Sequence, residues 1–174
     1  MSSKLIFPYE RIKAKDKLVE NIWKVFSMDL GDFYIISIPV RFQRTDGTWL
    51  KDTTKMFYDT GANISLLPMY MFEDLQIDKY VEHSMTGVVK SKECKLPLRI
   101  CRVKCRLEDD FGNKSPEFSF WIASDLDPNQ RLGFKSLAER NDVPSLLGMK
   151  DIIKLFKVKM DPDKEELCLY YNKE

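Results

Sequence analysis

The sequence predicts a mainly β protein, built as a barrel or as two packed sheets, with two or three short helices. Three observations support this fold class. Apolar and polar residues alternate along several segments, which is typical of strands with one buried face. Turn residues such as Asp46-Gly47 separate these segments, and the stretches with helical spacing are short.

The first elements lie between residues 10 and 58. Apolar residues at helical spacing in 10–27 predict one short amphipathic helix, although Trp23-Val25 could equally begin a strand. Alternation from 34 to 42 predicts a strand with one buried face. Asp46-Gly47 then predicts a hairpin turn, and 48–58 the returning strand.

The middle of the chain continues this pattern. A short helix is expected from Met69 to Leu75, followed by long strands within 80–107. The apolar positions change parity near 100–101, which predicts a bulge or a bend there. A turn at Asp110 to Asn113 then leads into a strand from Phe118 to Ala123.

The last part of the chain contains one long irregular stretch. Residues 124–142 are polar, and a connection of this length in a compact domain is either an insertion or a functional loop. A helix is expected from Met149 to Phe156. A final hairpin turns at Asp161-Pro162-Asp163 and ends with the strand Leu167-Tyr171.

Composition narrows the class of protein. The 174 residues are 44% apolar and 32% charged, which favours one folded domain, alone or with an appended segment. The formal charge of +1 gives no reason to expect nucleic acid or an anionic membrane as a partner. No apolar run suits a signal peptide or a membrane span, so we expect a soluble, cytoplasmic protein with reduced thiols. A single histidine and four scattered cysteines argue against a zinc site and a Ser-His-Asp triad.

One segment carries a candidate for chemistry. The apolar strand that ends at Tyr58 leads into Asp59, Thr60 and Gly61, and apolar residues then resume. A carboxylate between two apolar stretches is partly desolvated, which costs free energy unless the group is used or satisfied. Gly61 lets the backbone approach that carboxylate closely. The three residues alone are equally consistent with an ordinary β-turn.

A second segment favours the functional interpretation. In 143–153 the sequence Val-Pro-Ser-Leu-Leu-Gly leads into an apolar helix. Together, Asp59-Thr60-Gly61-Ala62 and the later Leu-Leu-Gly resemble the retropepsin-like aspartic proteases, over roughly residues 30–172. The resemblance implies a closed β-barrel of the acid-protease type with one or two short helices. It divides the chain into an N-terminal extension, 1–30, and a protease domain, 31–174.

The resemblance also implies a homodimer, because a single-domain member carries one catalytic aspartate. The only second candidate string, Asp52-Thr53-Thr54, lacks the glycine. Two Asp59 carboxylates, one from each copy, would hold one proton between them and activate a water against the peptide carbonyl of an extended polypeptide substrate. No metal or organic cofactor is implied.

The remaining site residues are carried over from the family by position. Thr60 would cross-link the two catalytic turns, and Gly61 would place its backbone beside the substrate. A flap is expected at 83–96. The predicted substrate-binding residues are Ala62, Asn63, Gly87, Val88, Val143, Pro144 and Leu146. The terminal strand residues Leu167, Leu169 and Tyr171 are candidates for the dimer interface.

Some features depart from viral members of the family. Their arginine after the glycine, and the aspartate with which it pairs, are here Met149 and Asn63, so the ion pair is lost as a unit. The flap is poor in glycine, and 105–142 is long. An alternative function is therefore a catalytically silent module for dimerisation or peptide binding.

Three further features have simpler interpretations. A basic run within 90–106 suggests a nucleic-acid strip, but a solvated strand edge explains it better. Cys101 and Cys105 are expected to be small core residues. His83 is expected on the surface.

Overall fold

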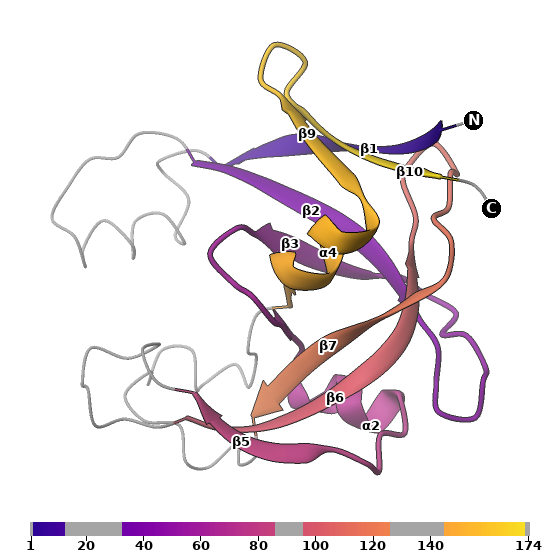
Figure 1. Cartoon of the computed structure of the whole chain (residues 1–174), viewed down its shortest axis with the longest axis vertical. Helices are drawn as coiled ribbons and strands as arrows, with labels where there is room; N and C mark the ends of the chain where they lie inside the picture. The colour runs from indigo at the N-terminus through magenta and orange to yellow at the C-terminus, as the bar shows by residue number, and fades with distance from the viewer. Residues whose placement is uncertain (1, 13–32, 86–95, 126–144, 173–174) are drawn as a thin grey trace, which may run out of the picture.

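The computed structural model describes residues 2–12, 33–85, 96–125 and 145–172. Within this part of the chain there are ten strands and two short helices (Figure 1). In chain order they are β1 (Ser2–Ile12), β2 (Phe33–Phe42), β3 (Thr54–Asp59), β4 (Ser65–Leu66), α2 (Met69–Asp74), β5 (Val81–Met85), β6 (Leu96–Leu107), β7 (Phe118–Asp125), β8 (Leu146–Gly148), α4 (Met149–Leu155), β9 (Lys157–Asp161) and β10 (Glu166–Asn172).

The strands form one sheet that closes on itself. Their order is β5-β6-β7-β4-β8-β3-β2-β1-β10-β9, and an additional pairing of β6 with β2 closes β6, β7, β4, β8, β3 and β2 into a six-stranded barrel. Val40 lies opposite Leu107 at this closure. The predicted mainly β class with short helices is therefore confirmed.

Alternation of side chains fills the barrel. Ile38, Val40 and Phe42 of β2 are fully buried, as the period-two pattern predicts. Phe42 packs on Phe120 of β7, with ring centroids 5.8 Å apart. The core thus joins strands that are far apart in the sequence.

The predicted turns are present, and α2 and α4 match the helices predicted near 69–75 and 149–156. Gly47 has a φ of +89°, and the Arg44 amide donates to the Thr48 carbonyl at 2.7 Å, so Asp46-Gly47 makes the expected turn. Gly112 has a φ of +82° in the turn after β6. The strand that returns from the first turn is shorter than predicted, because β3 begins only at Thr54.

Of the bulge or bend predicted near 100–101, the bulge is wrong. The pairing of β6 with β7 runs without interruption from Leu98 opposite Asp125 to Cys105 opposite Phe118. Leu98 is buried on one face of β6, whereas Cys101 and the alternate residues after it are buried on the other. The parity changes because the two halves of one regular strand bury opposite faces.

The strand β6, which carries several of the basic residues within 90–106, is not an edge strand of the sheet. This strand pairs with β7 on one side and with β5 and β2 on the other. Arg102 stacks over Trp121, and Lys104 makes an ion pair with Glu117 at 2.5 Å. Neighbouring aromatic and acidic side chains therefore engage these cations.

The first strand is an integral part of the sheet. β1 lies between β10 and β2, with Leu5 opposite Leu169 and Tyr9 opposite Ile36. The helix expected over 10–27 does not begin where predicted, because β1 continues to Ile12; residues 13–27 lie outside the described residues. β1 lies within the range 1–30 that was predicted to be an extension, yet it pairs with strands beyond that boundary.

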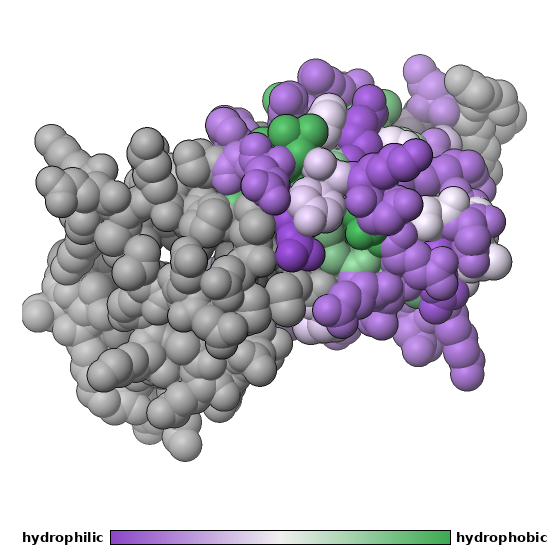
Figure 2. Space-filling view, turned by 90° about the horizontal axis from the view of Figure 1, so that it is seen from below, coloured by the Kyte–Doolittle hydropathy of each residue, from purple (hydrophilic) through white to green (hydrophobic). Residues whose placement is uncertain are grey.

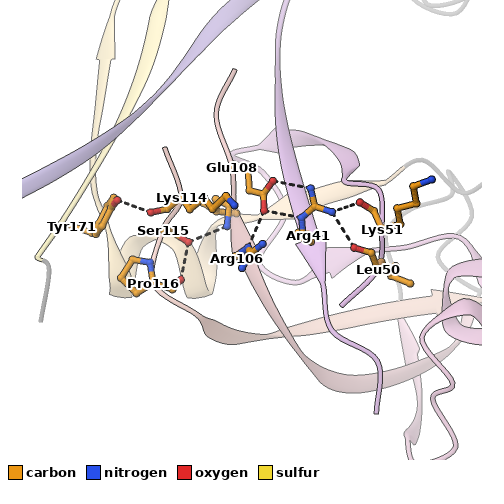
Figure 3. A network of polar contacts seen from close by, with 10 residues as sticks. Arg41, Leu50, Lys51, Arg106, Glu108, Lys114, Ser115, Pro116 and Tyr171 are labelled. Carbon is orange, nitrogen blue, oxygen red and sulfur yellow. Dashed lines mark hydrogen bonds and ion pairs between the residues drawn. The ribbon is translucent and has the colours of Figure 1, made fainter. Parts of the chain in front are cut away.

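The C-terminal hairpin is present as predicted, but its side chains serve the core. Leu167 and Leu169 of β10 are fully buried, and Tyr171 is 7% exposed. The Tyr171 hydroxyl donates to the Lys114 carbonyl at 2.7 Å (Figure 3). The expectation that these three residues form a dimer interface is wrong, because a single copy already buries them.

A cluster of charged side chains links β2 to β6 where the barrel closes. Glu108 accepts two hydrogen bonds from Arg41, at 2.7 and 2.9 Å, and one from Arg106 at 2.8 Å (Figure 3). Arg41 also donates to the carbonyls of Leu50 and Lys51. The Glu108 side chain is only 13% exposed, so this carboxylate is stabilised by hydrogen bonds rather than by water.

The described surface seen from the side of α2 and β5 is mainly hydrophilic (Figure 2). Hydrophobic residues occupy only small areas among the hydrophilic ones that this view shows. The described part of this face therefore offers little apolar surface to a partner.

Candidate active site

Asp59 is the last residue of β3 and opens the turn that leads to β4. Met56 points into the core of the barrel, and Asp59 has the opposite parity. Asp59 is half-buried, and Thr60 and Gly61 are exposed. The carboxylate therefore lies at the molecular surface, at the end of a strand that Met56 and Tyr58 anchor to the core.

Backbone groups of its own turn hold this carboxylate. The Gly61 amide donates to Asp59 Oδ1 at 2.8 Å, and the Ala62 amide donates to the Asp59 carbonyl at 3.3 Å. A Cβ atom at Gly61 would lie 3.3 Å from Asp59 Oδ1. The close approach predicted for Gly61 is thus observed, and the turn fixes one carboxylate oxygen.

The second segment of the resemblance lies directly beside the first. β8 pairs in parallel with β3, which places Leu146 opposite Phe57 and Gly148 opposite Asp59. A Cβ atom at Gly148 would lie only 2.7 Å from the backbone carbon of Ile64. A glycine is needed here because the backbone of β8 passes so close to the turn after Asp59.

The start of α4 is bonded to the same turn. The Met149 amide donates to the Ala62 carbonyl at 2.8 Å, and the Lys150 amide donates to the Asn63 carbonyl at 3.2 Å. No side chain caps the start of α4, so carbonyls of the turn after Asp59 accept these helix amides instead. Met149 and Asn63, which replace a charged pair of viral relatives, therefore lie at a junction held by backbone hydrogen bonds.

Two residues at the site were missed by the sequence analysis. Ser65 is 3% exposed, and its Oγ accepts a hydrogen bond from the Gly148 amide at 3.0 Å. Tyr58 precedes Asp59 and packs against the core, where burial raises the pKa of its hydroxyl. The signal for Ser65 was available, because a serine within the apolar run 64–67 needs a partner once it is buried.

The structure brings together six of the predicted site residues: Asp59, Thr60, Gly61, Ala62, Asn63 and Leu146. The other predicted substrate-binding residues, Gly87, Val88, Val143 and Pro144, lie outside the described residues. The tip of the expected flap and nearly all of the 124–142 loop also lie outside them. The catalytic and binding roles of all these residues stay predictions.

The other candidate side chains have ordinary surroundings. His83 is exposed on β5, as expected. Cys101 and Cys105 are buried with free thiols, and burial raises the pKa of Cys101 to about 11, so its thiol stays protonated. Among the described residues, no three His, Cys, Asp or Glu side chains are grouped so that they could hold a metal ion. No helix in the described part of the chain is both long and apolar enough to cross a membrane.

Comparison with known proteins supports the fold. No protein-family model and no curated protein matches the chain. A solved structure, a retropepsin-like aspartic protease from Rickettsia conorii, matches with a TM-score of 0.52 and 15% sequence identity. The match covers 98% of this chain and 92% of the Rickettsia chain. The two proteins share the retropepsin-like fold, so the predicted closed barrel of this type is confirmed.

Proposed function

We propose that this chain is an aspartic endopeptidase that acts as a homodimer on extended polypeptides. One observation carries the proposal. A retropepsin-like barrel presents its single Asp-Thr-Gly sequence on a surface turn, beside the Leu-Leu-Gly strand that the family resemblance pairs with it. The Rickettsia protein with the same fold is an aspartic protease.

The need for two copies follows from the chemistry. An aspartic protease uses two carboxylates about 3 Å apart, which hold one proton between them. This chain has one such aspartate, and the exposed Thr60 and Gly61 leave the turn accessible to a second copy. The site is complete only when the Asp59 turns of two copies meet.

The two carboxylates then have different roles in the reaction. The ionised one removes a proton from a bound water as the water attacks the scissile carbonyl. The protonated one donates a hydrogen bond to the carbonyl oxygen and stabilises its developing negative charge. No covalent bond to the enzyme forms, and the proton passes to the leaving amine when the peptide bond breaks.

The surrounding residues bind the peptide. Gly61, Ala62 and Asn63 supply backbone and side-chain groups next to Asp59, and Leu146 on the adjacent strand lines a side-chain pocket. Gly87, Val88, Val143 and Pro144 complete this proposed set. The proposal requires no metal or organic cofactor, and the cytoplasmic location stays a prediction.

The test is cleavage of a diverse peptide library by wild type and by Asp59→Asn, from about pH 3 to about pH 7. Asparagine is nearly isosteric, and its amide oxygen can still accept the Gly61 hydrogen bond. We expect the variant to lose at least about 10³-fold in kcat/KM. We expect its melting temperature to stay within about 2 °C of wild type.

A folded wild type that cleaves no peptide at any pH would contradict the proposal. Cleavage that persists in Asp59→Asn would assign the activity to another group. The control variant is Asp163→Asn, because Asp163 is an exposed residue in the turn between β9 and β10. This control should cleave as wild type does.

A further inference from the structure

We propose that Ser65 is a positioning residue for Asp59 and acts through the Gly148 amide. The inference deepens the proposed function and rests on it. Ser65 Oγ accepts the hydrogen bond from Gly148 at 3.0 Å, and Gly148 lies opposite Asp59 in the pairing of β3 with β8. A single side chain thus connects β4 to the residue that flanks the catalytic aspartate.

The hydroxyl has a role that water cannot take over. Ser65 is 3% exposed, and Gly148 is buried as well. A buried amide without a partner costs about 1–3 kcal/mol, so the Gly148 amide depends on this oxygen. Because Gly148 has no room for a side chain, its backbone is the group through which its position can be fixed.

The Ser65 hydroxyl also supplies a hydrogen bond of this junction that a side-chain substitution can remove. Three successive amides, of Gly148, Met149 and Lys150, donate to the segment 62–65. The acceptors for Met149 and Lys150 are backbone carbonyls, whereas the acceptor for Gly148 is a side chain. Losing the hydroxyl lets β8 and the start of α4 move relative to the Asp59 turn.

This movement affects catalysis more than binding. Proton sharing between two carboxylates depends steeply on their separation, and each copy contributes one loosened turn. A looser pair interacts less, so the acidic and basic limbs of the pH profile move toward each other. A residue with only a structural role would lower the amount of folded enzyme and leave the shape of the profile unchanged.

Ser124 provides a matched control. It lies on β7, which pairs with β4, and is fully buried, and its Oγ has no hydrogen-bond partner among the described residues. Ser65→Ala and Ser124→Ala therefore remove the same atom from neighbouring buried strands. Only the first leaves an amide without its acceptor.

The first measurement is amide hydrogen exchange in the full chain, followed by NMR. In wild type the Gly148 amide should be strongly protected. In Ser65→Ala its exchange should be at least about tenfold faster, whereas Ser124→Ala should leave it unchanged. An unprotected Gly148 amide in wild type would overturn the proposal without any variant, even if Ser65→Ala did not fold.

The second measurement is the pH dependence of kcat and KM, at a temperature where both variants are fully folded. We expect Ser65→Ala to lose about tenfold in kcat with KM within about twofold, and to show a narrower pH profile. Ser124→Ala should match wild type. Faster Gly148 exchange with unchanged kcat and pH profile would overturn the positioning role.

The two proposals fail in different ways. If wild type and Asp59→Asn are equally inactive, the proposed function is contradicted, and the positioning role of Ser65 in catalysis fails with it. Amide exchange then still decides whether the Ser65 hydrogen bond holds Gly148. If wild type cleaves and only Asp59→Asn is inactive, the Ser65 result tests the positioning role alone.

Discussion

Gly148 determines how closely its strand approaches the turn that carries Asp59. A Cβ atom there would lie within 2.9 Å of three backbone atoms of Asn63 and Ile64. Backbone cannot move aside as the end of a flexible side chain can. The distance between β8 and the Asp59 turn therefore depends on the absence of one methyl group.

We predict that Gly148→Ala lowers the free energy of unfolding by about 1–3 kcal/mol and reduces kcat more than any change in stability explains. The measurements are denaturant unfolding and peptide cleavage. Gly112→Ala is the control. Gly112 lies in the turn between β6 and β7, has a φ of +82°, and leaves open space for a Cβ atom. This variant should lose about 1 kcal/mol of stability through backbone strain and keep its kcat. Equal kcat in both variants would contradict the prediction.

For single residues, the sequence predicts candidate reactive groups better than it predicts contacts between distant residues. Asp59 and Gly61 are recognisable because a carboxylate and a glycine in a turn between apolar strands have a direct local meaning. For Ser65 the local sequence indicates that a buried serine needs a partner but not which one, because Gly148 is 83 positions away and pairs with it only after the barrel closes. A hydrogen bond between distant segments leaves no local pattern.

The stability of the junction between β2 and β6 depends on pH. The pKa of Glu108 is about 2, below its usual value of 4.5. The hydrogen bonds from Arg41 are the main cause, and the hydrogen bond from Arg106 adds to their effect. The folded state therefore binds this proton less readily than the unfolded state. The resulting stabilisation is fully present above about pH 4.5 and is lost as the pH falls toward about 2.

We predict that Glu108→Gln lowers the unfolding free energy near neutral pH by about 1–3 kcal/mol and weakens its pH dependence between about pH 4.5 and about pH 2. Denaturant unfolding across this range measures both effects. Glu117→Gln is the control, since Glu117 and its partner Lys104 are both about 45% exposed and such pairs contribute little. If the unfolding free energy fell equally steeply with decreasing pH in Glu108→Gln and in wild type, the prediction would be contradicted.

Elements with local signals are predicted well, and those that depend on distant pairing are not. The strand over 34–42 and the helices near 69–75 and 149–156 follow from residue spacing within each segment. β1 was missed because Pro8 interrupts its apolar run, and its partner β10 lies at the other end of the chain. The sequence also did not predict that β6 pairs without a bulge, because its buried face changes with the neighbours that cover it.

Under the proposed function, the whole molecule supplies half of an aspartic protease site. One Asp59 turn is held rigidly from behind by β8 and α4, with Thr60 and Gly61 exposed in front. Leu167, Leu169 and Tyr171 are buried within one copy, so the proposed dimer would have to form through other surfaces. The central claim is that catalysis belongs to the pair of chains and not to either chain alone.

The most direct test mixes wild type with Asp59→Asn in equal amounts and lets the subunits exchange. If each active site needs Asp59 from both copies, random pairing leaves about one quarter of the dimers active. Cleavage relative to pure wild type at the same total concentration should therefore fall to about one quarter. A fall to about one half would show that each chain acts alone and would contradict a shared site.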